Sequence, residues 1–466
     1  MDNQQYKKPS DAEEQLLCDQ FGEPSHTNPQ CVAGYYAKAG EPIVYSDADN
    51  GFLQYQKETG LWNCVKRERL LFALGCFCHW LAILLGLPKL DEKRSPAFLR
   101  GVIDFLKGIV PKAEDVFVKA IDRHIVHAAN TMLLFDMERG WIPTPFSPDF
   151  YSRGALTVDY VPGAKAPRFL NDLLRPVVSP CDIDLLQLFL GQCLLGENLS
   201  QRFLVLSGEA GSGKSTLVNL IESILGRQSC VEFRSQHAGG RFELGRLAGK
   251  TLLTAKDVGS EFLLSSGARK IKSLTGDDTL WIEFKHSDEV VELQGNFNLI
   301  ITGNSMLRIN IEGDVDAWKR RLLWVPFKRT APTGCIVKFA QILVAEEGSG
   351  ILNWALEGAA KLLRAGGKIT LSTEQRDRVH ELLDLSQPFD CFAAAHIVKT
   401  PGASISTEEG VRYFALFCER RGWPLISERE AQLLFNAWMR RQGAVARTDI
   451  MRNGHNKRGY GGYQFC

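Results

Sequence analysis

The sequence has no excess of charge of either sign. Among its 466 residues, 55 are lysine or arginine and 54 are aspartate or glutamate, which gives a formal net charge of +1. A chain with this balance has no overall attraction to a polyanion such as nucleic acid. Any basic surface must therefore be local, on one face or inside a pore.

The sequence also lacks the cysteine spacing of a metal site. Its twelve cysteines are scattered, and only Cys76 and Cys78 lie close together, with no CxxC pair and no cysteine–histidine cluster. A structural zinc site is therefore not expected. The opening MDNQQYKKPS is polar and has no secretory signal, so we expect reduced thiols in a cytoplasmic compartment.

Long apolar runs are scarce. The one stretch of membrane-spanning length is LLFALGCFCHWLAILLGL, residues 70–87. His79 and Trp80 interrupt its middle, and charged residues flank both ends. An imidazole at bilayer depth is costly, whereas a buried helix can hydrogen-bond it. We therefore expect the core helix of a soluble protein and no membrane association.

The composition, 45% hydrophobic and 23% charged, is that of a globular protein of several domains. We predict an α/β fold divided into residues 1–178, 179–368 and 369–466. The first segment is mainly helical in pattern. The second alternates apolar strands with helices, which is typical of a parallel sheet flanked by helices. The third is mostly helical and ends in a basic, glycine-rich tail.

The strongest motif is RFLVLSGEAGSGKST, residues 202–216. An apolar strand leads into a glycine loop and then into a helix, which is the context that a Walker A phosphate-binding loop requires. Lys214 would contact the β- and γ-phosphates of ATP, and Ser215 would ligate Mg²⁺. The predicted ATP-binding residues are Gly208, Glu209, Ala210, Gly211, Ser212, Gly213, Lys214, Ser215 and Thr216.

Two later apolar strands end in polar residues. TLLTAKD ends in Asp257, which is placed to hold the Mg²⁺ shell, although an aspartate at this position can also be an ordinary strand-end cap. FNLIITGNS carries Asn304, which could position the attacking water, although Gly-Asn is a common turn pair. Because both follow a Walker A motif, we predict that Asp257 and Asn304 belong to the same site.

Two further patterns carry positive charge. In DAWKRRLLWVPF, Arg320 and Arg321 precede an apolar strand, and an arginine there can stabilise the transition-state charge at a neighbouring subunit. The alternative is a solvated helix end. Residues 280–291, LWIEFKHSDEVV, predict a hairpin with Lys285 and His286 at its tip. That tip is either a solvated turn or a contact for the phosphate backbone.

With these motifs in this order, the chain resembles the superfamily 3 helicases, a branch of the AAA+ ATPases. It is most similar to the phage and plasmid primase–helicase family, which is related to poxvirus primase-helicases. HAANTMLLFDMERGWIPTPFSPDFYSRGALTVDY before the motor and GSGILNWALEGAAKLL after it also resemble that family. About three-quarters of the chain is covered.

The resemblance implies a hexameric ring whose hairpins line a central pore. Lys285 and His286 match the tip pair that grips DNA, and Arg321, with Arg320 as the fallback, would act on the neighbour's ATP. Lys272 resembles a position near the subunit interface. The segment before the motor would form a collar, in which His124 and His127 are interpreted as structural.

The chain departs from the family in two respects. Many members carry two adjacent acids at the second strand, whereas here Lys256 precedes the single acid Asp257, and Glu261 could contribute instead. No paired carboxylates or zinc ligands of a primase module stand out in the first 178 residues. We therefore expect the helicase portion alone, with a primase and a polymerase acting in trans.

The last segment contains two amphipathic helical patterns followed by a basic hairpin. This favours a winged-helix-like module that contacts duplex DNA through Lys457 and Arg458, with a protein-docking domain or a solvated tail as the alternative. Taken together, these patterns predict an ATP-dependent replicative DNA helicase of a phage, plasmid or mobile element in the cytoplasm of a bacterial host. The alternative is an origin-binding initiator that uses ATP as an assembly switch without unwinding DNA.

Overall fold

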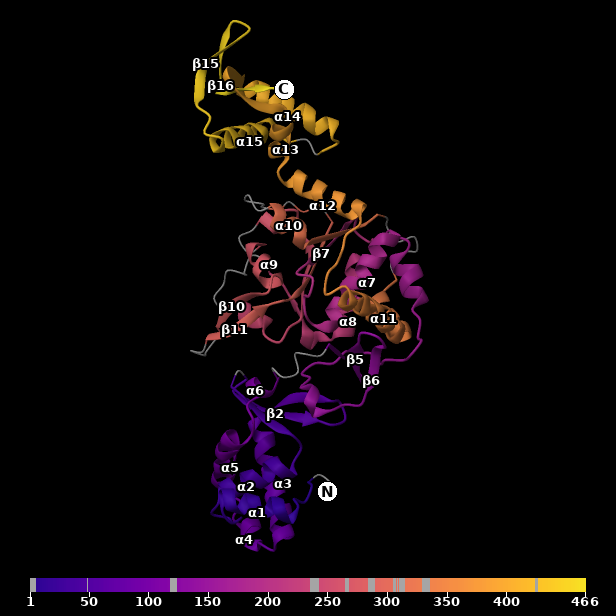
Figure 1. Cartoon of the computed structure of the whole chain (residues 1–466), viewed down its shortest axis with the longest axis vertical. Helices are drawn as coiled ribbons and strands as arrows, with labels where there is room; N and C mark the ends of the chain where they lie inside the picture. The colour runs from indigo at the N-terminus through magenta and orange to yellow at the C-terminus, as the bar shows by residue number, and fades with distance from the viewer. Residues whose placement is uncertain are drawn as a thin grey trace.

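The computed structural model describes residues 6–47, 49–117, 124–234, 243–264, 268–283, 290–304, 307, 309, 315–328, 336–423 and 426–466. Figure 1 shows an elongated chain with its amino-terminal unit at one end, a central sheet, and its carboxy-terminal unit at the other end. The fold is a mixed α/β arrangement whose central sheet has five strands flanked by helices.

The amino-terminal unit combines helices with a small antiparallel sheet in the order β1-β2-β3. Its cores are formed by side chains from Leu17 to Phe117, with Tyr151 packed against one of them. The elements are α1 (Asp11–Phe21), α2 (Pro29–Ala39), β1 (Ile43–Ser46), β2 (Gly51–Gln56), β3 (Leu61–Val65), α3 (Arg67–Leu85), α4 (Pro88–Glu92), α5 (Pro96–Ile109) and α6 (Ala113–Phe117).

Within the described residues, α3 is the one helix long and apolar enough to cross a membrane. Length and composition do not separate such a span from the core helix of a soluble protein. The helix buries residues such as Leu74 and Phe77 in the amino-terminal core, whereas Phe72 and Ile83 are each 68% exposed. The helix expected to be buried is thus buried along one face only.

The segment from Ile125 to Val178 packs with the central sheet, and the predicted division at residue 178 falls inside that shared core. It contains the antiparallel strands β4 (Ile125–His127), β5 (Met132–Asp136) and β6 (Gly140–Thr144), a short 3-10 turn at Pro148–Phe150, and one turn of π-helix at Phe169–Leu174. The first segment is predicted to be mainly helical, but residues 125–127 form β4, because they pair with β5.

The central sheet is entirely parallel, with the strand order β13-β7-β12-β9-β8. Its central strands are continuous runs of leucine, isoleucine and valine, as expected where helices cover both faces. The strands are β7 (Phe203–Gly208), β8 (Cys230–Glu232), β9 (Leu252–Val258), β12 (Asn298–Gly303) and β13 (Leu322–Phe327).

Helices lie on both sides of this sheet, with α7, α8 and α11 on one side and α9 and α10 on the other (Figure 1). They are α7 (Pro180–Leu195), α8 (Lys214–Leu225), α9 (Ala268–Thr275), α10 (Val315–Arg321) and α11 (Phe339–Arg364). Short 3-10 turns occur at Arg227–Ser229, Leu244–Leu247 and Phe262–Leu264. The predicted sheet flanked by helices is confirmed at this level.

The predicted hairpin is present between β9 and β12. Strands β10 (Asp278–Glu283) and β11 (Val290–Gly295) pair antiparallel, from Asp278 opposite Gly295 to Glu283 opposite Val290. The tip, with Lys285 and His286, lies outside the described residues.

The carboxy-terminal unit has its own core, formed by side chains from Phe389 to Tyr463. The predicted pair of amphipathic helices followed by a hairpin is confirmed. The elements are α12 (Thr373–Ser386), which packs with the central core, and then α13 (Pro388–His396), β14 (Ile397–Ser406), α14 (Thr407–Arg420), α15 (Glu428–Arg441), β15 (Ala446–Arg452) and β16 (His455–Phe465), with the sheet order β14-β16-β15.

Candidate functional site

The glycine loop joins β7 to α8 and requires glycine at two of its positions. Gly208 has φ +146°, and a Cβ there would lie 2.4 Å from the carbonyl oxygen of Phe327 on β13. Gly213 has φ +95° and precedes the first turn of α8. Residues other than glycine rarely adopt either backbone conformation. The loop therefore turns tightly at the amino-terminus of α8, and the backbone amides of such a loop and helix end suit an anion.

Lys214 lies at the start of α8 and is 3% exposed. Its Nζ donates hydrogen bonds to the carbonyl oxygens of Gly208 and Glu209, both at 2.8 Å, and to the Ser212 Oγ at 3.1 Å. Burial lowers the pKa of Lys214, and the negative charge of Asp257 opposes that shift. The loop thus holds a desolvated ammonium group whose present partners are neutral oxygens.

Asp257 and Asn304 come to the same edge of the sheet as the glycine loop. Strand β12 lies between β7 and β9, and all three are parallel, so that their carboxyl ends meet at one edge. Both side chains are exposed. The sequence prediction that these residues belong together is consistent with this placement, and their roles remain a prediction.

The backbone at Asp257 departs from regular strand geometry. It has φ +50°, and the β9–β12 register shifts between Ile301 and Gly303. Its backbone N–H donates to the buried Thr302 Oγ1 at 2.9 Å. Aspartate tolerates this left-handed conformation better than most residues do. Because such irregularities re-aim side chains, the irregularity sets the direction of the Asp257 carboxylate.

Lys256 stands beside Asp257 but points to α8. Its Nζ contacts the Glu222 Oε2 at 2.6 Å and the Asn219 Oδ1 at 2.8 Å, and the Thr254 hydroxyl donates to the other oxygen of Glu222 at 2.7 Å. Glu261 lies in the exposed turn after β9. Asp257, rather than Glu261, is therefore the acid at the end of β9.

Arg320 and Arg321 lie at the opposite edge of the sheet from the glycine loop. They end α10, and β13 then runs parallel to β7, from Leu322 opposite Phe203 to Phe327 opposite Gly208. Five strand steps separate the two edges by roughly 17 Å. Arg320 is exposed, whereas Arg321 is partly buried, with its Nη1 3.5 Å from the Ala317 carbonyl oxygen.

Lys272 lies on α9, and its Nζ is 5.2 Å from the centroid of the Trp318 ring. The family resemblance implies a position near a subunit interface for this lysine. Trp318 belongs to α10, the helix that ends in the two arginines. This cation–π contact therefore connects α9 to the arginine helix, within one chain.

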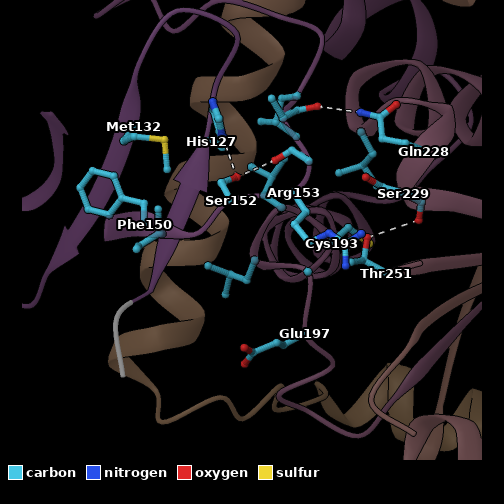
Figure 2. A pocket seen from close by; sticks show the side chains of 18 of the residues that line it. His127, Met132, Phe150, Ser152, Arg153, Cys193, Glu197, Gln228, Ser229 and Thr251 are labelled. Carbon is cyan, nitrogen blue, oxygen red and sulfur yellow. Dashed lines mark hydrogen bonds between the residues drawn. The ribbon is translucent and has the colours of Figure 1, made fainter. Parts of the chain in front are cut away.

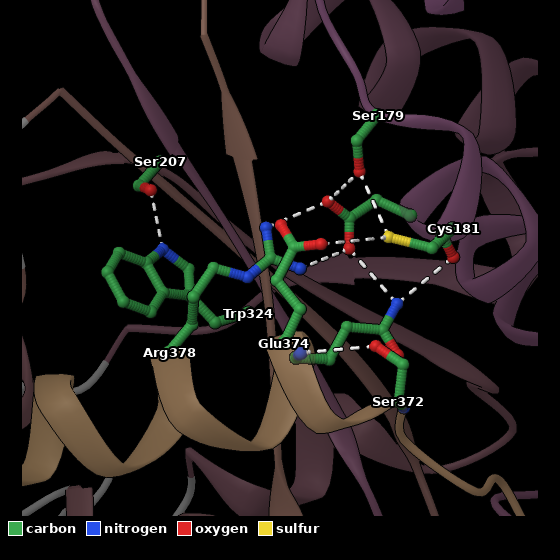
Figure 3. Close-up of polar contacts among 9 residues, drawn as sticks. Ser179, Cys181, Ser207, Trp324, Ser372, Glu374 and Arg378 are labelled. Atoms are coloured by element: carbon green, nitrogen blue, oxygen red, sulfur yellow. Dashed lines mark hydrogen bonds and ion pairs between the residues drawn. The ribbon is translucent and has the colours of Figure 1, made fainter.

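A polar network beside the glycine-loop strand was not found from the sequence. Asp182, in the first turn of α7, is fully buried and receives hydrogen bonds from Ser179 at 2.6 Å, Gln375 at 3.1 Å and Arg378 at 2.8 Å (Figure 3). Burial alone would raise the pKa of Asp182, but these donors outweigh burial and hold that pKa below its usual range. The network joins α7 to α12.

Most basic residues in and just before the carboxy-terminal hairpin form ion pairs with acidic side chains. Four of the six cations from Arg440 onward have acidic partners: Arg441 with Asp390, Arg447 with Asp449, Arg452 with Glu409, and Lys457 with Glu408. No ion pair of Arg440 or Arg458 is found among the residues that the structure describes. The local basic surface is therefore smaller than residue counting indicates.

A cavity of about 440 Å³ lies at the amino-terminal edge of the sheet (Figure 2). His127 lines it and is nearly buried. Its Nε2 donates to the Thr59 carbonyl oxygen at 2.9 Å, and its Nδ1 contacts the Ser152 hydroxyl at 2.7 Å. Thr59 belongs to the turn before β3, so His127 links the amino-terminal unit to the central one. Both ring nitrogens thus contact oxygens of the chain, and the structural role of His127 stays an interpretation.

This link predicts a dependence of stability on pH. Burial lowers the pKa of His127. The unfolded chain therefore takes up a proton below about pH 6.5 while the folded chain does not, so stability present above that pH is lost as pH falls. We expect the thermal midpoint to drop between pH 7.5 and 5.5, and to drop less in His127→Asn. The exposed His124→Asn variant is the control, and an equal drop in all three proteins would contradict the prediction.

Among the described residues, no group of three or more histidine, cysteine, aspartate or glutamate side chains could hold a metal ion. A Mg²⁺ ion bound with a nucleotide does not require such a group, because phosphate oxygens and water supply most of its ligands. The Ser215 hydroxyl, in the first turn of α8, and the Asp257 carboxylate, at the carboxyl end of β9, fit that requirement.

Comparisons with known proteins give limited likenesses. No curated protein matches the sequence. An A-form apo structure of the NrS-1 C-terminal region is 13% identical, with a TM-score of 0.45, covering 90% of this chain and 95% of that one. A second, of residues 305–718, is 14% identical with a TM-score of 0.44, covering 93% and 98%. Residues 206–321 match a family of unknown function, DUF5906. That match runs from the loop strand to Arg321.

Proposed function

We propose that this protein is an ATP-dependent replicative DNA helicase of a phage, plasmid or mobile element, with an AAA+ core of the superfamily 3 type. The observation that carries the proposal is the glycine loop between β7 and α8, which holds the buried Lys214 ammonium beside the strand ends of Asp257 and Asn304. The strand order supports it, because β12 lies directly between the loop strand and the acid strand.

The residues of the site divide the work of hydrolysis. The amides from Gly208 to Thr216 would cradle the phosphates, and Lys214 would exchange its carbonyl partners for β- and γ-phosphate oxygens, which attract an ammonium more strongly. Ser215 and Asp257 would hold Mg²⁺, which draws charge from the phosphates when bound. The Asn304 amide would orient the attacking water toward the γ-phosphorus.

The arginines support a ring. At the far edge of their own sheet, Arg320 and Arg321 cannot serve the glycine loop of the same chain. A head-to-tail neighbour would bring that edge against the next loop, which is the heterologous contact of a closed ring, here a hexamer. Exposure favours Arg320 as the residue that reaches the neighbour, whereas the family resemblance favours Arg321. Either one would stabilise transition-state charge.

The hairpin would couple hydrolysis to DNA. In the sequence, its stem (β10 and β11) lies between β9, which carries Asp257, and β12, which precedes Asn304. Lys285 and His286 at the tip would bind the backbone of single-stranded DNA without reading its sequence. Arg458 and, less strongly, the paired Lys457 would contact duplex DNA. A primase and a polymerase would act in trans, in the cytoplasm of a bacterial host.

The test is unwinding of a forked duplex together with ATP turnover, for wild type and Lys285→Ala. We expect the variant to hydrolyse ATP but to unwind at least about tenfold more slowly, because it loses its phosphate contact. Lys89→Ala, which changes an exposed lysine of α4, is the matched control and should unwind normally. Hydrolysis without unwinding by wild type, with either tail polarity, would contradict the helicase.

One observation favours the second candidate, an origin-binding initiator that uses ATP as an assembly switch. Lys256 occupies the place of a second acid and is fully engaged with Glu222 and Asn219, which leaves one carboxylate at the strand end. Slow turnover that DNA does not stimulate, with ATP-dependent assembly and no unwinding, would establish the initiator.

A further inference from the structure

A cavity of about 670 Å³ lies over α11, and the proposed reaction does not use it. Its walls are the start of β6, the loop of residues 160–166, and the second half of α11. Figure 1 shows β6 beside α11, although more than 200 residues separate them in the sequence. Among the residues that the structure describes, neither the glycine loop nor the hairpin stem contributes to its lining.

The walls are held in place by contacts between these segments. The Asn353 Nδ2 donates to the carbonyl oxygens of Val161 and Ala164, at 2.9 and 3.0 Å. The Trp141 Nε1 donates to the Leu356 carbonyl oxygen at 2.8 Å. A Cβ on Gly350 would lie 2.1 Å from the Lys165 carbonyl oxygen, so the loop can sit this close only against glycine. The cavity is therefore preformed.

The lining combines aromatic rings with positive charge. Its aromatic side chains are Trp141, Tyr160 and Trp354, and its cations are Lys165, Lys361 and Arg364, against the single acid Glu357. All three rings are partly buried against the central core. Lys165 is exposed, and among the described residues its side chain has no hydrogen bond or ion pair. An apolar ligand would make no use of three cations in so small a space.

One polar atom of the lining lacks a partner. The Asn353 Oδ1 is buried and accepts no hydrogen bond, although the other end of the same amide is fully engaged. The two Nδ2 bonds fix the orientation of this amide, so Asn353 holds the loop of residues 160–166 against α11.

We propose that this cavity binds a segment of single-stranded nucleic acid. The bases would stack on the rings of Tyr160 and Trp354. The phosphates would lie against Lys165 and against Lys361, whose Nζ donates to the Gln187 Oε1 at 2.6 Å in the unbound chain. Aromatic platforms beside a positive groove are how proteins hold single strands without regard to sequence. In the described part of the chain, neither the glycine loop nor the hairpin stem lines this cavity, so the site goes beyond the proposed function.

The test is fluorescence anisotropy of a fluorescein-labelled oligothymidylate with the full chain, without nucleotide, across a salt series. Lys165→Glu and Tyr160→Ala should each weaken binding about tenfold, since one base stack or one phosphate contact is lost. Lys165→Glu should also reduce the slope of log K against log salt by about 0.7. Lys368→Glu makes the same charge change on the exposed segment after α11 and should bind as wild type does.

Two results would overturn the proposal: wild type that does not bind the oligonucleotide, or binding that Lys165→Glu and Tyr160→Ala leave unchanged. Binding lost only in Lys285→Ala would place the strand at the hairpin and would also overturn it. If the protein hydrolyses no ATP but binds the oligonucleotide through Lys165, the helicase proposal fails and the proposal of this binding site holds. Failure of one proposal can therefore be distinguished from failure of the other.

Discussion

Lys214→Ala is expected to lower the rate of ATP hydrolysis by at least about 100- to 1,000-fold, the loss typical of removing one group that stabilises transition-state charge. The expectation follows from the state of this lysine before any nucleotide binds. Lys214 is 3% exposed, and the three partners of its ammonium, the oxygens of Gly208, Glu209 and Ser212, are neutral. Folding has therefore already removed water from the Lys214 ammonium, so the site needs little reorganisation when a phosphate binds.

We expect MgATP to raise the thermal midpoint of wild type, and the same substitution should abolish that rise, because a ligand stabilises only the state that binds it. Turnover and this shift are measured side by side. Lys250→Ala is a matched control, since Lys250 also donates to a backbone carbonyl, that of Gln228 at 2.7 Å, but at the other edge of the same sheet. Retention of more than about a tenth of wild-type turnover by Lys214→Ala would refute the role.

The elements of the candidate site were predictable because their signals are local. The strand, the glycine loop and the helix around Lys214 occupy consecutive residues, and the positive φ at Gly208 and Gly213 is a constraint that glycine alone meets easily. The same holds for the β10–β11 hairpin and for the two capped helices of the carboxy-terminal unit, where Ser406 and Glu409 form a capping box.

The other features of the fold and of the site depend on contacts between residues that are far apart in the sequence. Hydrophobic periodicity does not predict such contacts. Asp182 meets Arg378 across 196 positions, and Trp141 meets Leu356 across 215. Residues from Val126 onward join the central core rather than the amino-terminal unit, because β4 packs against α7 and β6 packs against α11. The pairing of Lys457 with Glu408 likewise depends on tertiary placement, so a count of basic residues overstated the charge of the hairpin.

Asp182→Ala is expected to lower the free energy of unfolding of the central unit by about 3–5 kcal/mol, the usual cost of removing one partner of a buried ion pair. Asp182 is 0% exposed, and the Arg378 side chain is 13% exposed, so water cannot replace the lost carboxylate. Arg378 would remain in the interior without its counter-charge, and Gln375 would lose one of its links to α7.

The consequence should be visible at the junction of α7 and α12. The capping box of α12, formed by Ser372 and Gln375, directs the Gln375 amide to the Cys181 carbonyl oxygen at 3.0 Å as well as to Asp182 (Figure 3). Loss of Asp182 therefore loosens the helix that connects the central unit to the carboxy-terminal one. We expect earlier proteolytic cleavage near residues 386–388, between α12 and α13, in the variant.

Scanning calorimetry measures the effect, with a fall in the thermal midpoint on the order of 10 °C for the central unit. Asp390→Ala is the matched control, because its partner Arg441 is 59% exposed and such a surface pair contributes about 1 kcal/mol or less. The double variant Asp182→Leu with Arg378→Leu should recover much of the loss, since apolar side chains remove the stranded charge as well as its partner. If Asp182→Ala unfolds at the wild-type temperature, or if the double variant is no better than the single one, the ion pair does not secure α12 to α7.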